Sequence, residues 1–188
     1  MTTSISGSTG INKIQNNAVD IADLSATGTA SASTFLCGNN TWAEAGGTNT
    51  PNFMIRQGTA TSLVSATRTK VELNTAIFDT DSGLDADNDR WTVPAGKGGT
   101  YLITYALRFE TGTDIHGIQA AVYKNGSSLY SVWGSTHYYE SLSSSFLAVL
   151  AEADYLEMYG LQHSVGAVNA STSDHGVQTF LGGVRLTT

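Results

Sequence analysis

An alternating pattern over residues 101–109 constrains the fold of this chain more than any other feature. Apolar residues stand at every second position, namely Tyr101, Ile103, Tyr105, Leu107 and Phe109. Successive side chains of a strand point to opposite faces of a sheet, so a period of two marks a half-buried strand. We therefore predict a β-strand over 101–109.

A second alternating segment follows and ends at a turn. Ile118, Ala120 and Val122 continue the period of two, and Asn125-Gly126 comes next. Both turn residues tolerate positive φ, which makes Asn-Gly the strongest short hairpin pattern. The returning strand is predicted at Leu129–Trp133.

Other short segments have the same character, and we find no convincing amphipathic helix. Strands are predicted at Phe53–Gln57, Lys70–Leu73, Arg90–Val93, His137–Leu150, Tyr155–Gln162 and Val177–Leu186. Short strands at this spacing are typical of a β-sandwich or barrel. The sequence therefore predicts an all-β domain.

The composition changes near residue 50. Residues 1–49 are mostly Ser, Thr, Ala, Gly and Asn, and they cannot bury enough apolar surface to offset their ordering entropy. We predict an extended polar attachment arm and linker at 1–49 and a folded domain at 50–188. Five aliphatic side chains of the arm are predicted to contact its partner: Ile5, Ile11, Ile14, Val19 and Ile21.

Charge and targeting patterns narrow the possible partners. The 188-residue chain has a net charge of −7, and its nine Lys and Arg residues are scattered singly. A nucleic-acid partner would require a basic patch, so we expect none. The start has no apolar stretch typical of a signal peptide, and no segment has the length of a membrane span. We expect a soluble protein that is made in a cytoplasm and has no membrane partner.

One acidic segment, 79–89, raises the question of a cation site. Its carboxylates, Asp79, Asp81, Asp85, Asp87 and Asp89, could ligate a hard cation such as Ca²⁺. The spacing fails the helix-loop-helix calcium pattern, because neither possible register ends in Glu. The alternative is a solvated loop with local side-chain hydrogen bonds. We predict no metal site and keep these residues as weak candidates.

Catalytic patterns are missing from the sequence. The four histidines lack the spacing of a local metal site, no G-x-S-x-G elbow occurs, and Gly96–Gly99 lacks the spacing of a phosphate-binding loop. The single cysteine, Cys37, has no internal disulfide partner. We predict no catalytic residues, no cofactor and no enzymatic activity.

Aromatic residues gather late in the chain. They are Tyr123, Tyr130, Trp133, Tyr138, Tyr139, Phe146, Tyr155 and Tyr159. They could form a surface that stacks on sugars or binds a receptor. We favour the alternative of a sandwich core with a subunit interface, where Tyr and Trp are enriched.

Several short motifs in 52–188 resemble a known family. They are Phe78-Asp79, Gly83-Leu84, Arg90-Trp-Thr-Val-Pro94-Ala-Gly96, Gly99-Thr-Tyr101-Leu-Ile-Thr-Tyr and the closing segment Thr179–Leu186. They are similar to the globular heads of complement collagen-like subunits and to the tumour-necrosis-factor family. The resemblance implies a jelly-roll β-sandwich of about ten antiparallel strands and a homotrimer. Residues expected in the core or at the trimer interface are Trp91, Tyr130, Trp133 and Phe180.

The arm resembles a different group of proteins. Asp23-Leu-Ser-Ala-Thr-Gly28-Thr-Ala-Ser-Ala-Ser-Thr34-Phe-Leu-Cys-Gly38-Asn-Asn-Thr-Trp42-Ala is similar to a linker of tailed-bacteriophage fibre and virion proteins. Cys37 stands where Arg is usual and Asn39 where Asp is usual. The resemblance implies a location on the virion.

Three functions follow as hypotheses. The first is a capsid decoration or cement protein, whose arm binds the major capsid protein. The second is a short tail fibre or receptor-binding tip that recognises a host surface glycan or receptor. The third, an enzyme, is the weakest, because glycan hydrolysis needs carboxylates placed across a groove. We favour the first, because an arm of about 50 residues, reaching at most about 3.3 Å per residue, suits direct attachment to a shell.

Overall fold

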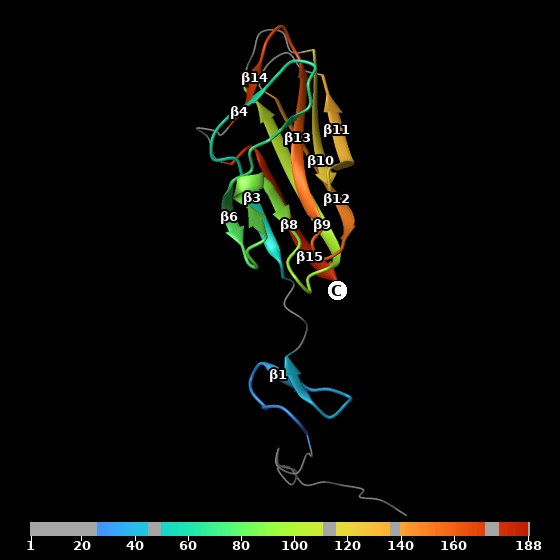
Figure 1. Ribbon diagram of the computed structural model, residues 1–188. Coiled ribbons are helices and arrows are strands. Elements are labelled where there is room, and N and C mark those ends of the chain that lie inside the picture. Colours follow the sequence, from blue (N-terminus) through green and yellow to red (C-terminus); the bar gives the residue numbers. More distant parts are fainter. Residues whose placement is uncertain (1–25, 45–49, 111–115, 136–139, 172–176, 188) are drawn as a thin grey trace, which may run out of the picture. The chain divides into compact units, whose positions relative to one another are not determined.

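The chain divides into two compact units, Met1–Thr48 and Asn49–Thr188. The computed structural model describes residues 26–44, 50–110, 116–135, 140–171 and 177–187. In the larger unit, two antiparallel sheets form a sandwich (Figure 1). This confirms the predicted all-β jelly roll.

The first sheet, called here the β10 sheet, has the order β11-β10-β13-β8-β7, and β5 also pairs with β13. Its strands are β11 (Ser127–Gly134), β10 (Gly117–Lys124), β13 (Tyr155–His163), β8 (Arg90–Thr92), β7 (Leu84–Asp85) and β5 (Thr69–Lys70).

The second sheet, called the β9 sheet, has the order β4-β14-β9-β15-β3-β6, and β12 also pairs with β9. Its strands are β4 (Thr61–Leu63), β14 (Val168–Ala170), β9 (Gly99–Phe109), β15 (Phe180–Thr187), β3 (Asn52–Arg56), β6 (Thr75–Asp79) and β12 (Glu140–Leu150). The central strand β9 is the alternating segment that the sequence predicted.

The core lies between the sheets and is built around Trp91. This residue is fully buried, stacks on Phe53 at 3.8 Å between ring centroids, and meets Tyr101 edge-on. A Cβ at Gly83 would lie 2.5 Å from the Trp91 indole nitrogen, so only glycine allows the chain to pass so close. The Gly-Leu turn therefore needs glycine at position 83, because the buried Trp91 leaves no room for a side chain there.

The predicted hairpin is confirmed. β10 and β11 pair in antiparallel register, and Asn125 and Gly126 have φ values of 51° and 76°. A bulge between Val122 and Tyr123 shifts the register by one residue on β11. The cross-strand pairs with β10 determine which side chains of β11 point away from the core.

Some predicted strands needed correction. Of Lys70–Leu73 only Lys70 lies in a strand, because Val71 and Leu73 are buried in an irregular segment. Val177–Leu186 begins as a strand only at Phe180. Residues 137–139 of the predicted His137–Leu150 lie outside the described residues. The acidic segment is not a simple loop, because it contains β7 and a 3-10 turn, η2 (Ala86–Asn88).

The smaller unit contains a hairpin that the sequence analysis did not predict. β1 (Thr34–Leu36) pairs with β2 (Trp42–Glu44), and Thr27 forms a bridge to Thr41. At Gly28, φ is 88° and a Cβ would lie 2.7 Å from the Trp42 carbonyl oxygen. The glycine of the linker motif is thus required by the close approach of two chain segments.

Candidate functional site: an apolar face of the β9 sheet

The outer face of the β9 sheet is unusually apolar. Along β9 the inward side chains, such as Tyr101 and Ile103, are fully buried, while Leu102 points outward and is 38% exposed. Along β12, Leu147 and Val149 are also outward and are 65% and 74% exposed. Single exposed apolar residues are common, but neighbouring ones on one face mark an interaction surface.

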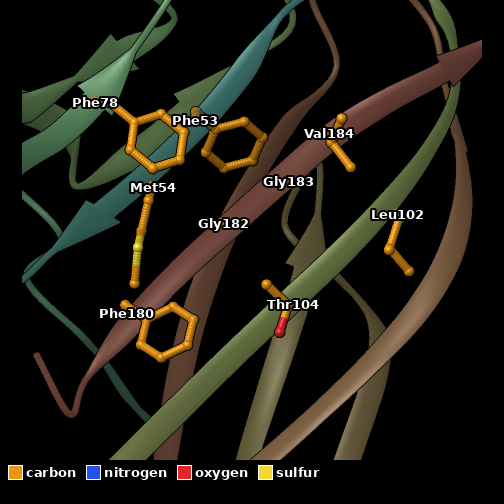
Figure 2. Close-up of a pocket in the computed structure, with 9 residues that line it drawn as sticks. All are labelled: Phe53, Met54, Phe78, Leu102, Thr104, Phe180, Gly182, Gly183 and Val184. Carbon is orange, nitrogen blue, oxygen red and sulfur yellow. The ribbon is translucent and has the colours of Figure 1, made fainter. Parts of the chain in front are cut away.

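A pocket lies in this face (Figure 2). It has a volume of about 350 Å³ and is lined by Phe53, Met54, Phe78, Leu102, Thr104, Phe180, Gly182, Gly183 and Val184. Figure 2 shows Met54, Phe78 and Phe180 on one side of the β15 glycines, with Leu102 and Thr104 on the other. No charged side chain lines the pocket.

Of the two consecutive glycines of β15, Gly182 opens the hollow on the outer face, whereas Gly183 faces the core. A Cβ at Gly182 would meet the Phe53 carbonyl oxygen at 3.1 Å, and one at Gly183 would meet the Phe53 ring at 2.6 Å. The missing side chain of Gly182 leaves the outer surface open between Met54 and Thr104, both of which would lie within van der Waals range of a Cβ there. The pocket therefore suits an apolar side chain supplied from outside this subunit.

One lateral edge of the sandwich adjoins the apolar face. Among the strands that the structure describes, β12 pairs only with β9 and β11 only with β10, so each has an edge with no described partner strand. Tyr130 of β11 stacks on Phe146 of β12 with ring centroids 4.7 Å apart, yet remains 41% exposed. An exposed strand edge beside apolar side chains is a site where another chain can pair, so stable proteins protect or occupy such edges.

The four residues predicted for the core or trimer interface lie in different places. Trp91 belongs to the core of a single subunit, and Phe180 lines the apolar pocket. Tyr130 lies at the β11–β12 edge, whereas Trp133 lies on the outer face of the opposite sheet. The five aliphatic residues predicted for attachment, between Ile5 and Ile21, lie outside the described residues.

The weak candidates for cation ligands have separate local partners. Asp79 accepts hydrogen bonds from the Leu84 amide at 2.7 Å and from the Trp91 indole at 3.4 Å. Asp81 pairs with Lys97 at 2.9 Å. The hydrogen bond from Lys97 is the main cause that lowers the pKa of the Asp81 carboxyl.

The other aspartates of the segment do not converge either. Asp85 binds Arg90 at 2.9 Å and also accepts from Asn88, which is the main cause of its lowered pKa. Burial raises the pKa of Asp89. Within the part of the chain that the structure describes, no group of three or more potential ligands could hold a metal ion.

The remaining polar candidates do not form a catalytic arrangement among the described residues. The His116 amide donates to the His163 carbonyl, which joins the backbones of two strands, and Cys37 is exposed. Burial raises the pKa of both Tyr101 and Tyr105 to about 12, so both phenols are neutral at ordinary pH. No helix in the described ranges is long and apolar enough to cross a membrane.

The sequence analysis missed most of the apolar face. Met54, Phe78, Leu147 and Val149 were not predicted as site residues, although all lie on or beside it. A pattern was present in 101–109, where Leu102 adds an apolar group to the face opposite the core residues. A strand that is apolar on both faces is covered on both faces.

Comparison with known proteins supports the fold. No protein-family model matches the chain, and no curated protein matches it. A crystal structure of murine APRIL at pH 8.0 has a TM-score of 0.55 and 24% identity, covering 72% of this chain and 98% of that chain. The pH 5.0 structure of murine APRIL has a TM-score of 0.50 and 23% identity, covering 72% and 100%.

The globular domain of zebrafish Complement 1qA is also similar, with a TM-score of 0.49 and 13% identity over 71% of this chain and 95% of that chain. The neighbours are thus tumour-necrosis-factor-like and complement globular domains. At these identities, the likeness to APRIL establishes the jelly-roll fold and nothing further. The comparisons give no evidence of a bacteriophage origin.

Proposed function

We propose that this chain is a non-catalytic virion protein of a tailed bacteriophage, a capsid decoration protein that assembles as a homotrimer through the apolar face of the β9 sheet. The observation that carries the assembly is the uncharged pocket on a face where Leu147 and Val149 are more than half exposed. A protein that left this face in water would be prone to aggregation. The family that the motifs resemble assembles as homotrimers.

A second copy is the partner that fits the pocket best. The apolar residues of β12 and the apolar pocket around Gly182 lie at different places on one face. Side chains from the β12 edge of one copy can therefore enter the pocket of the next copy. Both surfaces are apolar, and no charge of one would be buried against the other. Contacts between different patches are heterologous, and they form a closed ring when the rotation between copies is suitable.

The placement on a phage capsid rests on the linker motif. In this motif, Gly28 and Trp42 form the close contact of the small hairpin unit. The apolar residues from Ile5 to Ile21 supply the proposed capsid contacts, each worth about 1.5–3 kcal/mol if fully buried. Three arms in one trimer would add avidity.

Two measurements test this proposal. Sedimentation of the 188-residue chain should give a trimer at micromolar concentration, and a monomer would refute the assembly. Heads that lack tails should bind the chain saturably, and removal of residues 2–22 should abolish this binding without dissociating the trimer. Binding only to tails or to host cells would contradict the decoration role and favour a receptor-binding tip.

The receptor-binding alternative has one observation in its favour. Trp133 is 56% exposed on the outer face of the β10 sheet, which the proposed assembly does not cover. An exposed tryptophan among polar groups is typical of a recognition surface.

A further inference from the structure

The outer face of the β10 sheet carries a row of side chains centred on Gln119. Ile118, Ala120 and Val122 of β10 point into the core, so the intervening Gln119 and Ala121 point to the opposite face of the sheet, where neighbouring side chains cover them to 3% and 1% exposure. Gln119 is the cross-strand partner of Trp133 on β11 and of Leu161 on β13. Trp133, Gln119 and Leu161 thus form one row across three adjacent strands.

Arg68, a cationic side chain, lies at the end of this row. The Arg68 Nε donates to the Gln119 Oε1 at 3.2 Å, and Arg68 itself is exposed. Arg68 forms no ion pair with any residue that the structure describes. The hydrogen bond engages one N–H of the guanidinium, and because Arg68 is exposed, the remaining N–H groups of its planar fork are available as donors.

The next row adds aromatic surface. Ala121 pairs with Ser131 on one side and Tyr159 on the other. Tyr159 lies 4.3 Å from Tyr123 between ring centroids, and both rings are half-buried. Rows are about 6.8 Å apart and strands about 4.8 Å, so the Trp133 and Tyr159 positions are about 12 Å apart. Within this span Ala121 is covered by its neighbours, while Ser131 is exposed.

We propose that the surface defined by Trp133, Arg68, Ser131 and Tyr159, called the Trp133 platform, binds a carboxylate-bearing polysaccharide. The indole would stack on the C–H face of a sugar ring, and Arg68 would bind a carboxylate through its free N–H groups. The exposed Ser131 hydroxyl would bind a ring hydroxyl, and the buried Gln119 would hold Arg68 in position. The proposal does not depend on where the protein sits on a particle.

The chemistry favours a polysaccharide over a protein partner. Protein interfaces have an apolar core in which charged groups are depleted. Here the exposed indole shares its face of the sheet with an exposed guanidinium and an exposed hydroxyl, those of Arg68 and Ser131. The unpaired Arg68 on a chain of net charge −7 adds a local preference for an anion.

Affinity electrophoresis of the 188-residue chain tests the proposal. The gels would contain polygalacturonate, alginate, hyaluronate or polysialate, with dextran and carboxyl-reduced polygalacturonate as neutral controls. At least one carboxylated polymer should retard the protein, and its neutral counterpart should retard it at least about tenfold less. Trp133→Ala and Arg68→Ala should each weaken retardation at least about tenfold, as expected for central contacts.

Val165→Ala is the matched control, because Val165 is 84% exposed and lies outside the platform. It should leave retardation unchanged. Sedimentation of each variant should match the parent protein. The proposal is overturned if no carboxylated polymer retards the protein, if Trp133→Ala has no effect, or if Arg68→Ala has none. Dissociation of the oligomer by Trp133→Ala would also overturn it, because Trp133 would then be an assembly contact.

Discussion

Replacing Leu147 and Val149 by serine tests the assembly face with little risk to the fold. Both side chains point outward from β12 and are 65% and 74% exposed. Serine already occupies outward positions 141, 143 and 145 of the same strand. Such exposed substitutions change the stability of a single subunit by at most about 0.5 kcal/mol.

The expected loss in assembly is much larger. Full burial of a Val or Leu side chain contributes about 1.5–3 kcal/mol, and about two-thirds of each side chain is still available for burial by a partner. The double variant therefore loses about 2–4 kcal/mol per subunit, or about 6–12 kcal/mol per trimer. At about 1.4 kcal/mol per tenfold change, the trimer should dissociate at micromolar concentration.

Sedimentation velocity over a hundredfold concentration range would measure this. The parent chain should remain a trimer, the Leu147→Ser/Val149→Ser variant should sediment as a monomer, and circular dichroism should be the same for both. Val165→Ser is the matched control, since Val165 is exposed but lies in a loop away from the apolar face. If the double variant stays as trimeric as this control, the apolar face is not the interface.

Three further outcomes can be measured. Trp91→Ala should lower the free energy of unfolding by about 3–5 kcal/mol in urea titrations, because it empties the centre of the core; a loss below 1 kcal/mol would contradict this packing. Lys97→Ala should destabilise the domain near neutral pH, because Lys97 lowers the pKa of Asp81. A depressed carboxyl pKa stabilises the fold above the ordinary value, so the difference from the parent chain should shrink as the pH falls through about 4; a constant difference would exclude this cause. Brief proteolysis of the free protein should cut within 1–49 and spare the domain, and equal resistance of both parts would refute the predicted arm.

The sequence was most informative where a pattern is local. The alternation of 101–109 and the Asn125-Gly126 turn each specify a structure within a few residues, and both are confirmed. Strands β4 and β14 were missed, because three residues cannot establish a period of two. Their pairing depends on contacts between residues about a hundred positions apart, which a local pattern cannot encode.

The candidate site was harder to predict for a related reason. The pocket forms where β3, β6, β9 and β15 lie side by side, so no single segment contains it. Gly182 and Gly183 were recognised as part of a closing strand, but the hollow at Gly182 depends on Met54 and Thr104 from the neighbouring strands. The sequence also offered no reason to select Arg68 as a site residue, because its hydrogen bond to Gln119 forms only in the folded structure.

The two outer faces of the sandwich differ in chemistry, and we propose different roles for them. The β9 face would serve assembly, and the Trp133 platform would serve recognition. The β9 face has an uncharged pocket and exposed aliphatic side chains, which gain free energy from any dry contact of matching shape. The Trp133 platform combines an aromatic ring with polar groups. These groups favour a partner whose own polar groups are placed to form hydrogen bonds with them. A trimer built through the first face would leave three copies of the second exposed to solvent. Weak binding at each platform would then combine into strong attachment to a repetitive polymer.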